Sequence, residues 1–142
     1  MGQTTRPGRV LGLDLGDVRI GVAISDDERR MAMPLGTVHT GAPADLFAIA
    51  KLVEEHAATA VVVGLPLSMT GERGGAAVKA GSFADALSSI LSVPVELHDE
   101  RLSTVEAERA LRDAGVGGRE RRSVVDRSAA TIILQAWLDA HR

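Results

Sequence analysis

The feature that most constrains the fold is a change in hydrophobic periodicity part-way along the chain. Before the change, three short apolar segments at residues 10–14, 20–25 and 31–39 have the character of β-strands. The first two are close enough to form a hairpin. Pro34 lacks a backbone N–H, so the third strand is expected at a sheet edge. These segments predict an antiparallel meander.

After the change, strands alternate with helices. Short apolar runs predict strands over residues 59–63 and 93–97. Stripes with helical spacing predict helices over residues 46–53, 76–91 and 125–140. A capping box that begins at Ser103 and the stop signal Gly115 predict a further helix over residues 103–115. Strand–helix alternation favours parallel pairing with helices on both faces of the sheet. We therefore predict one α/β domain over residues 1–142, a mixed five-stranded sheet with helices on both faces, and a flexible tail over residues 1–8.

Composition narrows the class of protein further. The chain has 142 residues and no cysteine, which excludes disulfide scaffolds, thiolate zinc sites and cysteine nucleophiles. The longest apolar stretch, residues 60–67, is too short to span a bilayer, and residues 1–9 show no apolar core of a signal peptide. We expect a cytoplasmic protein with no membrane partner.

Charge gives a second constraint. The net charge of −3 is unlike that of a basic nucleic-acid binder, and three aromatic residues are too few for a base-stacking platform. Residues 117–127 nevertheless carry a local excess of arginine. Two interpretations stay open for this segment: contact with phosphates, or a solvated loop before the last helix. Its arginines are Arg119, Arg121, Arg122 and Arg127.

Four carboxylates are candidates for chemistry. Asp14 ends an apolar strand, where an ion must be paired or bound to a metal, although Asp also commonly begins a turn. Asp99 and Glu100 point to opposite sides of an extended chain, so one can face a site while the other pairs with Arg101. Asp126 has capping-box spacing, but the small residues after it would let the last helix approach the sheet and bring Asp126 towards Asp14. Separated carboxylates suit a hard cation such as Mg²⁺.

Several segments carry a specific pattern over essentially residues 10–138. The block His98-Asp99-Glu100-Arg101-Leu102-Ser103-Thr104 is highly specific. The other segments are Leu13-Asp14-Leu15-Gly16, Arg19-Ile20-Gly21-Val22-Ala23, Val63-Gly64-Leu65-Pro66-Leu67, Val125-Asp126 and Ser128-Ala129. In their order and spacing, these segments together resemble the YqgF (RuvX) family.

The resemblance implies a ribonuclease H-like fold and a metal-dependent nuclease that matures the 5′ end of pre-16S rRNA. It implies that Asp14, Glu100 and Asp126 are catalytic and hold Mg²⁺ or Mn²⁺, with Asp99 as the alternative to Glu100. The substrate expected is structured RNA, with branched DNA as a further candidate. The nucleic-acid contacts expected are Arg19, Arg101, Arg119, Arg121, Arg122 and Arg127.

Two departures from the family pattern affect the expected substrate contacts. Asp17-Val18 stands where the family often has Thr-Lys, and Ser68 stands where it often has Asn. The alternative functions are a nucleic-acid or transcription-machinery binding module with weak or no catalysis, and a Holliday-junction resolvase. The ribosome or transcription machinery are candidate partners, and the chain is expected to be a monomer or a weak homodimer.

Overall fold

The computed structural model describes residues 7–66, 74–102 and 128–142. The elements follow the predicted order of strands and helices in these ranges. They are β1 (Arg9–Leu15), β2 (Arg19–Ser25), β3 (Ala32–His39), α1 (Ala44–Glu55), β4 (Ala58–Leu65), α2 (Gly75–Ile90), β5 (Val95–Asp99), the short 3₁₀ helix η1 (Glu100–Leu102) and α5 (Ala129–Ala140).

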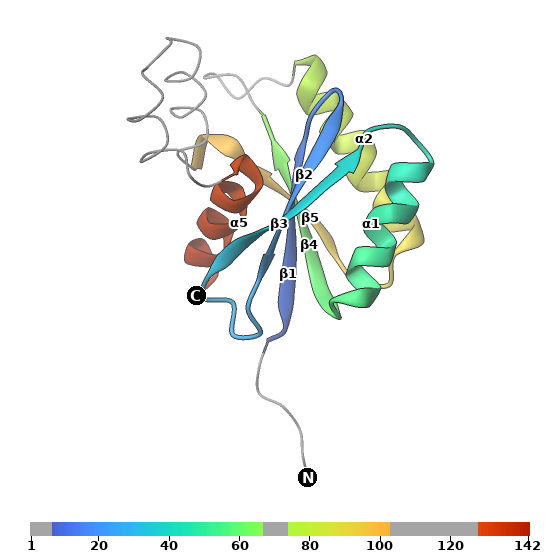
Figure 1. Ribbon diagram of the computed structural model, residues 1–142. Helices are drawn as coiled ribbons and strands as arrows, with labels where there is room; N and C mark the ends of the chain where they lie inside the picture. Colours follow the sequence, from blue (N-terminus) through green and yellow to red (C-terminus); the bar gives the residue numbers. More distant parts are fainter. Residues whose placement is uncertain (1–6, 67–73, 103–127) are drawn as a thin grey trace, which may run out of the picture.

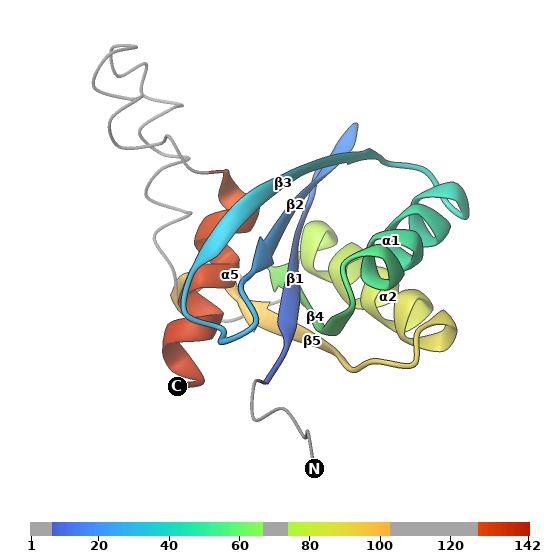
Figure 2. The same cartoon turned by 60° about the horizontal axis from the view of Figure 1, so that its bottom comes forward.

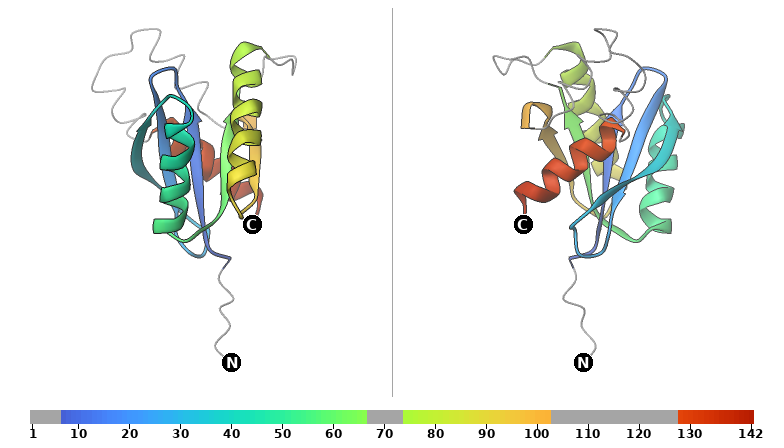
Figure 3. Two further views of the ribbon diagram at one scale, coloured as in Figure 1. Left: turned by 90° about the vertical axis from the view of Figure 1, so that its right-hand side faces the viewer. Right: turned by 60° about the vertical axis from the view of Figure 1, so that its left-hand side comes forward.

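The five strands form one mixed sheet in the order β3-β2-β1-β4-β5 (Figure 1). β1, β2 and β3 pair antiparallel, and β4 pairs parallel with both β1 and β5. Helices α1 and α2 cover one face and α5 covers the other (Figures 2 and 3). The mixed five-stranded sheet with helices on both faces is therefore confirmed, as is the edge position of β3, the strand that carries Pro34.

Alternating side chains of the sheet supply two separate apolar cores. Leu11 and Leu13 of β1 belong to the core beneath α1 and α2. Val10 belongs to the core beneath α5, together with Ile133 and other apolar residues of that helix. The central strand β4 contributes to both cores, as expected for a parallel strand buried on both faces.

Helix α5 packs closely against the sheet, because glycines of β1 and β2 face it. A β-carbon on Gly12 would lie 2.7 Å from Leu134 Cβ, and one on Gly21 would lie 3.6 Å from Ala130 Cβ. The close approach expected from the small residues at positions 128–130 is thus confirmed. Since Gly21 pairs with Asp14 across the hairpin, the first turn of α5 begins beside Asp14.

Some predicted boundaries need correction. β5 runs two residues later than predicted, so His98 and Asp99 lie inside the strand. In the described part of the chain, α5 begins at Ala129, where the Ser128 hydroxyl accepts a hydrogen bond from Thr131 N. The helix predicted over 103–115 and the proposed start of the last helix at residue 125 lie outside the described residues.

Only Pro7 and Gly8 of the tail predicted over residues 1–8 are described. Gly8 N donates a hydrogen bond to Asp27 O, and the carbonyl of Pro7 accepts one from Thr59 Oγ1. Pro7 and Gly8 are therefore attached to the folded part of the chain. Residues 1–6 lie outside the described residues.

Candidate nuclease site

A cavity of about 690 Å³ lies at the carboxyl edge of the parallel strands. Ligands of open α/β sheets bind at this edge, because the loops that follow parallel strands meet there. The cavity is lined by Asp14, Leu15, Gly16, Asp17, Ile20, Thr40, Asp45, Gly64, Pro66, Gly75, Ala76, Lys79, Ala80, Phe83 and Glu100. It brings together β1, β4, α2 and η1, which are far apart in the sequence.

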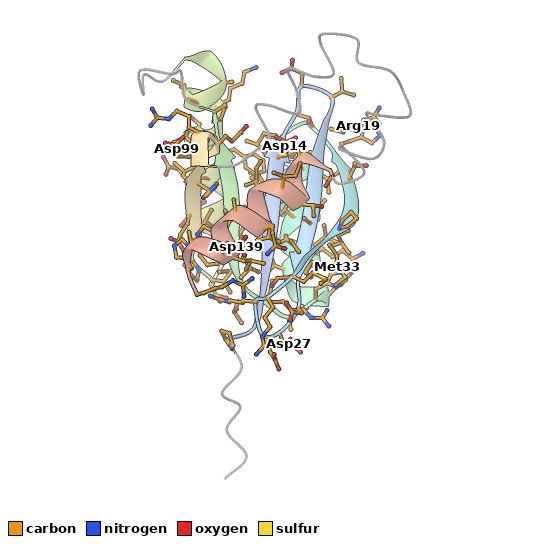
Figure 4. All side chains as sticks on the ribbon, turned by 90° about the vertical axis from the view of Figure 1, so that its left-hand side faces the viewer. Asp14, Arg19, Asp27, Met33, Asp99 and Asp139 are labelled. Atoms are coloured by element: carbon orange, nitrogen blue, oxygen red, sulfur yellow. The ribbon has the colours of Figure 1, made fainter. Side chains whose placement is uncertain are left out.

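Asp14 lies inside β1, one residue before the end of the strand. The turn that follows is closed by Gly16 and Arg19, whose backbone N–H and carbonyl form a 3.0 Å hydrogen bond. Backbone groups therefore close the turn, and Asp14 lies within the strand before it. Figure 4 shows Asp14 at the same end of the sheet as Asp99 and opposite to Asp27.

Glu100 is the buried carboxylate that reaches the cavity from β5. It is 6% exposed and begins η1, directly after the strand. The neighbouring strand makes room for it, because a β-carbon on Gly64 would lie 2.9 Å from Glu100 Oε2. Although β5 is separated from β1 by β4, the glycine in β4 allows the Glu100 side chain to lie against that strand.

Asp99 is occupied by a different partner. Its carboxylate accepts hydrogen bonds from Arg101 Nη2 at 2.7 Å and from Arg101 Nε at 3.0 Å. The Arg101 side chain, with a further bond from its backbone N–H, holds the pKa of Asp99 below its usual range. The predicted division of labour, with one carboxylate facing the site and the other paired with Arg101, is therefore observed, and Glu100 is the one that lines the cavity.

The remaining predicted site residues are only partly described. Arg19 is exposed at the start of β2, near the same end of the sheet as Asp14 (Figure 4). Arg101 is engaged with Asp99. The other predicted residues, namely Asp126, Arg119, Arg121, Arg122 and Arg127, lie outside the described residues.

The sequence analysis missed two charged residues that line the cavity. Asp45 is 4% exposed in the first turn of α1, and its carboxylate accepts hydrogen bonds from Gly41 N and Leu46 N. Lys79 is on α2, and its ammonium lies 3.9 Å from Asp17 Oδ1. Neither residue belongs to a recognisable sequence motif. Each reaches the cavity only because α1 and α2 pack against the sheet.

The cavity is acidic. Among its lining residues in the described part of the chain, Asp14, Asp17, Asp45 and Glu100 oppose the single cation Lys79. No group of three acidic, histidine or cysteine side chains that could hold a metal ion occurs within residues 7–66, 74–102 and 128–142. The described part of the site therefore offers a pair of carboxylates, Asp14 and Glu100, from the predicted set of three.

His98 is buried in β5, where it pairs with Gly64 of the neighbouring strand β4. Burial lowers the pKa of His98, and its Nε2 has no hydrogen-bond partner within the described ranges. The His98 imidazole is packed in the sheet and does not line the cavity.

Comparison with known proteins identifies the family. A sequence model named RuvX and described as Holliday junction resolvase matches residues 8–140. The chain belongs to the RuvX family. This confirms the resemblance found in the motifs around Asp14 and Glu100.

Curated relatives and solved structures agree with this assignment. The relative from Myxococcus xanthus is 52% identical over 135 residues, which cover 94% of this chain and 89% of the relative. The relative from Chloroflexus aurantiacus is 51% identical over 134 residues, covering 94% and 88%. Both are named "Putative pre-16S rRNA nuclease".

RuvC from Thermus thermophilus, solved in complex with a Holliday junction substrate, matches with a TM-score of 0.57 and 18% identity over 94% of each chain. A second T. thermophilus RuvC structure matches with a TM-score of 0.53 and 17% identity, and the match covers 94% of this chain and 95% of RuvC. These likenesses confirm the ribonuclease H-like fold.

None of the described helices is long and apolar enough to cross a membrane.

Proposed function

We propose that this chain is a metal-dependent nuclease that hydrolyses phosphodiester bonds in RNA, with 5′-end maturation of pre-16S rRNA as its role in the cytoplasm. The observation that carries the proposal is that Asp14 and Glu100, which are distant in sequence, line one cavity at the carboxyl edge of the sheet. The names of the curated relatives support the choice of RNA as substrate.

The charge of the cavity supports a role for a divalent cation. Four carboxylates against one ammonium disfavour a phosphodiester in the cavity, and a cation held by Asp14 and Glu100 would offset this repulsion. The donor set fits a hard cation, because carboxylate oxygens are the ligands that Mg²⁺ and Mn²⁺ accept, with waters and a substrate phosphate completing the shell. When bound, such an ion activates water and stabilises the leaving oxygen.

The residues of this chain have distinct tasks in the proposal. Asp14 and Glu100 would hold the ion, and burial of Glu100 against Gly64 would fix the direction from which it approaches. Asp126 is proposed as the third ligand. It precedes Ser128 by two residues in the sequence, and α5 begins beside the Asp14–Gly21 pair.

Hydrolysis would add one water across the P–O bond, leaving a phosphate on one fragment and a hydroxyl on the other. The phosphates of the RNA strand would be bound by arginines, namely Arg19, Arg101, Arg119, Arg121, Arg122 and Arg127. Because Asp99 already neutralises much of Arg101, we expect Arg101 to contribute less than Arg19.

A Holliday-junction resolvase is the second candidate, favoured by the description of the matching family. A binding module with weak or no catalysis is the third. One experiment separates them: incubation of the protein with an RNA spanning the 5′ end of 16S rRNA, or with a four-way DNA junction, in Mg²⁺, Mn²⁺ or EDTA.

The proposal predicts metal-dependent cleavage of the RNA, lost in EDTA and in Asp14→Asn, with the junction left intact. Cleavage of the junction alone would establish the resolvase. Tight binding of the RNA without cleavage in either metal would establish the binding module.

A further inference from the structure

Lys79 occupies a distinctive place in the cavity. It is on α2, one turn after Gly75 and Ala76, which also line the cavity, whereas Asp14 and Glu100 come from the sheet and η1. No other lysine or arginine of the described ranges lines it. A negatively charged strand that enters the cavity would therefore meet one ammonium among the lining side chains.

The present partner of Lys79 holds it weakly. The ammonium lies 3.9 Å from Asp17 Oδ1, and the two side chains are 78% and 95% exposed. An ion pair with this exposure contributes little, because water screens the charges and both side chains lose rotamer freedom. Exchanging Asp17 for another anion would cost the fold almost nothing.

A phosphate is a better partner than Asp17 in this position. A lysine binds phosphate as a point charge, without the planar geometry that an arginine needs. Each phosphate neutralised by a cation also releases counterions, which favours binding at low salt. The pair between Asp17 and Lys79 joins the β1–β2 turn to α2, and both residues line the cavity, so the exchange would take place on its exposed lining.

We propose that Lys79 binds a backbone phosphate of the substrate strand next to the cleaved bond, exchanging Asp17 for that phosphate. The inference rests on the proposed nuclease function and adds one residue that the family motifs do not contain. It makes Lys79 a substrate-binding residue and Asp17 its competitor.

The chain provides a matched control for Lys79. Lys51 on α1 is 77% exposed, and its ammonium lies 3.8 Å from Glu55, but it does not line the cavity. Lys79→Gln and Lys51→Gln thus remove the same charge from two lysines that are equally exposed and each lie near one carboxylate. If the two variants differ in RNA binding, the position of the lost charge is responsible, because both variants lose the same charge.

The test measures binding without cleavage. A fluorescent RNA spanning the 5′ end of 16S rRNA is titrated with protein in EDTA at several salt concentrations, and the dissociation constant is read from anisotropy. Loss of one phosphate contact lowers the slope of log K against log salt by about 0.7 to 0.9. The weakening caused by Lys79→Gln should therefore be about threefold larger at 50 mM than at 200 mM salt. Lys51→Gln should keep the wild-type slope.

Asp17→Asn gives the opposite sign. It frees Lys79 and should tighten RNA binding, and the gain should shrink when Lys79→Gln is also present, because the two residues are coupled. Asp27→Asn is the control, since Asp27 pairs with Arg9 at 3.5 Å at the other end of the sheet (Figure 4). It should leave binding unchanged.

A wild-type slope for Lys79→Gln, or equal slope changes in both lysine variants, would overturn the inference. So would a gain from Asp17→Asn that is the same with and without Lys79. Because the readout is binding, its failure is distinct from failure of the nuclease proposal, which is decided by cleavage with Mg²⁺.

Discussion

Replacing Gly64 with alanine is expected to displace the Glu100 carboxylate while the sheet stays folded. Gly64 lies near the end of β4, under both Glu100 and α5. A β-carbon at this position would lie 2.9 Å from Glu100 Oε2 and 2.7 Å from Ile133 Cδ1. Both distances are too short for stable contacts, so both side chains must move.

The size of each movement follows from these distances. Carbon atoms reach optimal contact at about 3.5–4.0 Å, so Ile133 Cδ1 must retreat by about 0.8 Å or more. The Glu100 oxygen must move by about 0.5 Å to reach ordinary contact. Overpacking the core costs about 1–3 kcal/mol. Misplacing a reactive group by about 1 Å costs roughly hundredfold in rate, so we expect at least about a tenfold loss of cleavage from Gly64→Ala.

A second substitution separates the core conflict from the conflict at the site. Ile133→Val removes the Cδ1 atom, at its own cost of about 0.5–1.5 kcal/mol. In the Gly64→Ala, Ile133→Val double variant the conflict with Glu100 remains. We expect its melting temperature to recover relative to Gly64→Ala, while the Mn²⁺-induced rise in melting temperature and the single-turnover cleavage rate both stay low.

Gly12→Ala is the matched control. A β-carbon there would lie 2.7 Å from Leu134 Cβ, and its three nearest atoms all belong to Leu134 and Ala130. This variant should lose stability but keep the response to Mn²⁺. A wild-type metal response and rate in the double variant, or a lost metal response in Gly12→Ala, would refute the reasoning about Glu100.

Three further predictions concern stability and binding. Hydrogen bonds from the backbone of Met31, and then of Arg30, keep the pKa of Asp26 below its usual value. Ionised Asp26 therefore stabilises the fold above about pH 4, and this stabilisation is lost as the pH falls through the lowered pKa. Asp26→Asn should therefore lower the melting temperature at pH 7 and much less at pH 3; an equal loss at both would contradict the argument. Ser128→Ala removes the cap of α5 and should cost about 0.5–2 kcal/mol in denaturant unfolding, against no change if the cap bond is unimportant. Replacing two arginines between residues 117 and 127 should flatten the salt dependence of RNA binding, and an unchanged slope would return them to a solvated loop.

Much of the fold followed from local patterns. The period-two segments and the Pro34 position predicted the meander and its edge strand, and the apolar β-branched run predicted the buried strand β4. Boundaries were less accurate, because β5 is extended to Asp99 by its pairing with β4, which no local signal reports. The apolar stripe over residues 76–91 located α2 well, because the helix spans Gly75–Ile90.

The site was predictable only where its functional residues are adjacent in the sequence. The opposite directions of Asp99 and Glu100 in an extended chain, with Arg101 beside them, were visible in the sequence. The choice between the two carboxylates was not, because it depends on the space left by Gly64 on the neighbouring strand. Lys79 was missed for the same reason: its place in the cavity is set by the packing of α2.

The central claim, that Asp14 and Glu100 form the metal site of a nuclease, is tested most directly by comparing Glu100→Gln with Asp99→Asn. The two residues are adjacent, and each substitution removes one charge with little change in shape. We predict that Glu100→Gln, like Asp14→Asn, abolishes the Mn²⁺-induced rise in melting temperature and lowers RNA cleavage by orders of magnitude, while RNA binding in EDTA persists. Asp99→Asn should keep the metal response and most of the cleavage, because its carboxylate serves Arg101. A Glu100→Gln protein that binds Mn²⁺ and cuts RNA like the wild type, or an Asp99→Asn protein that has lost both, would contradict the assignment.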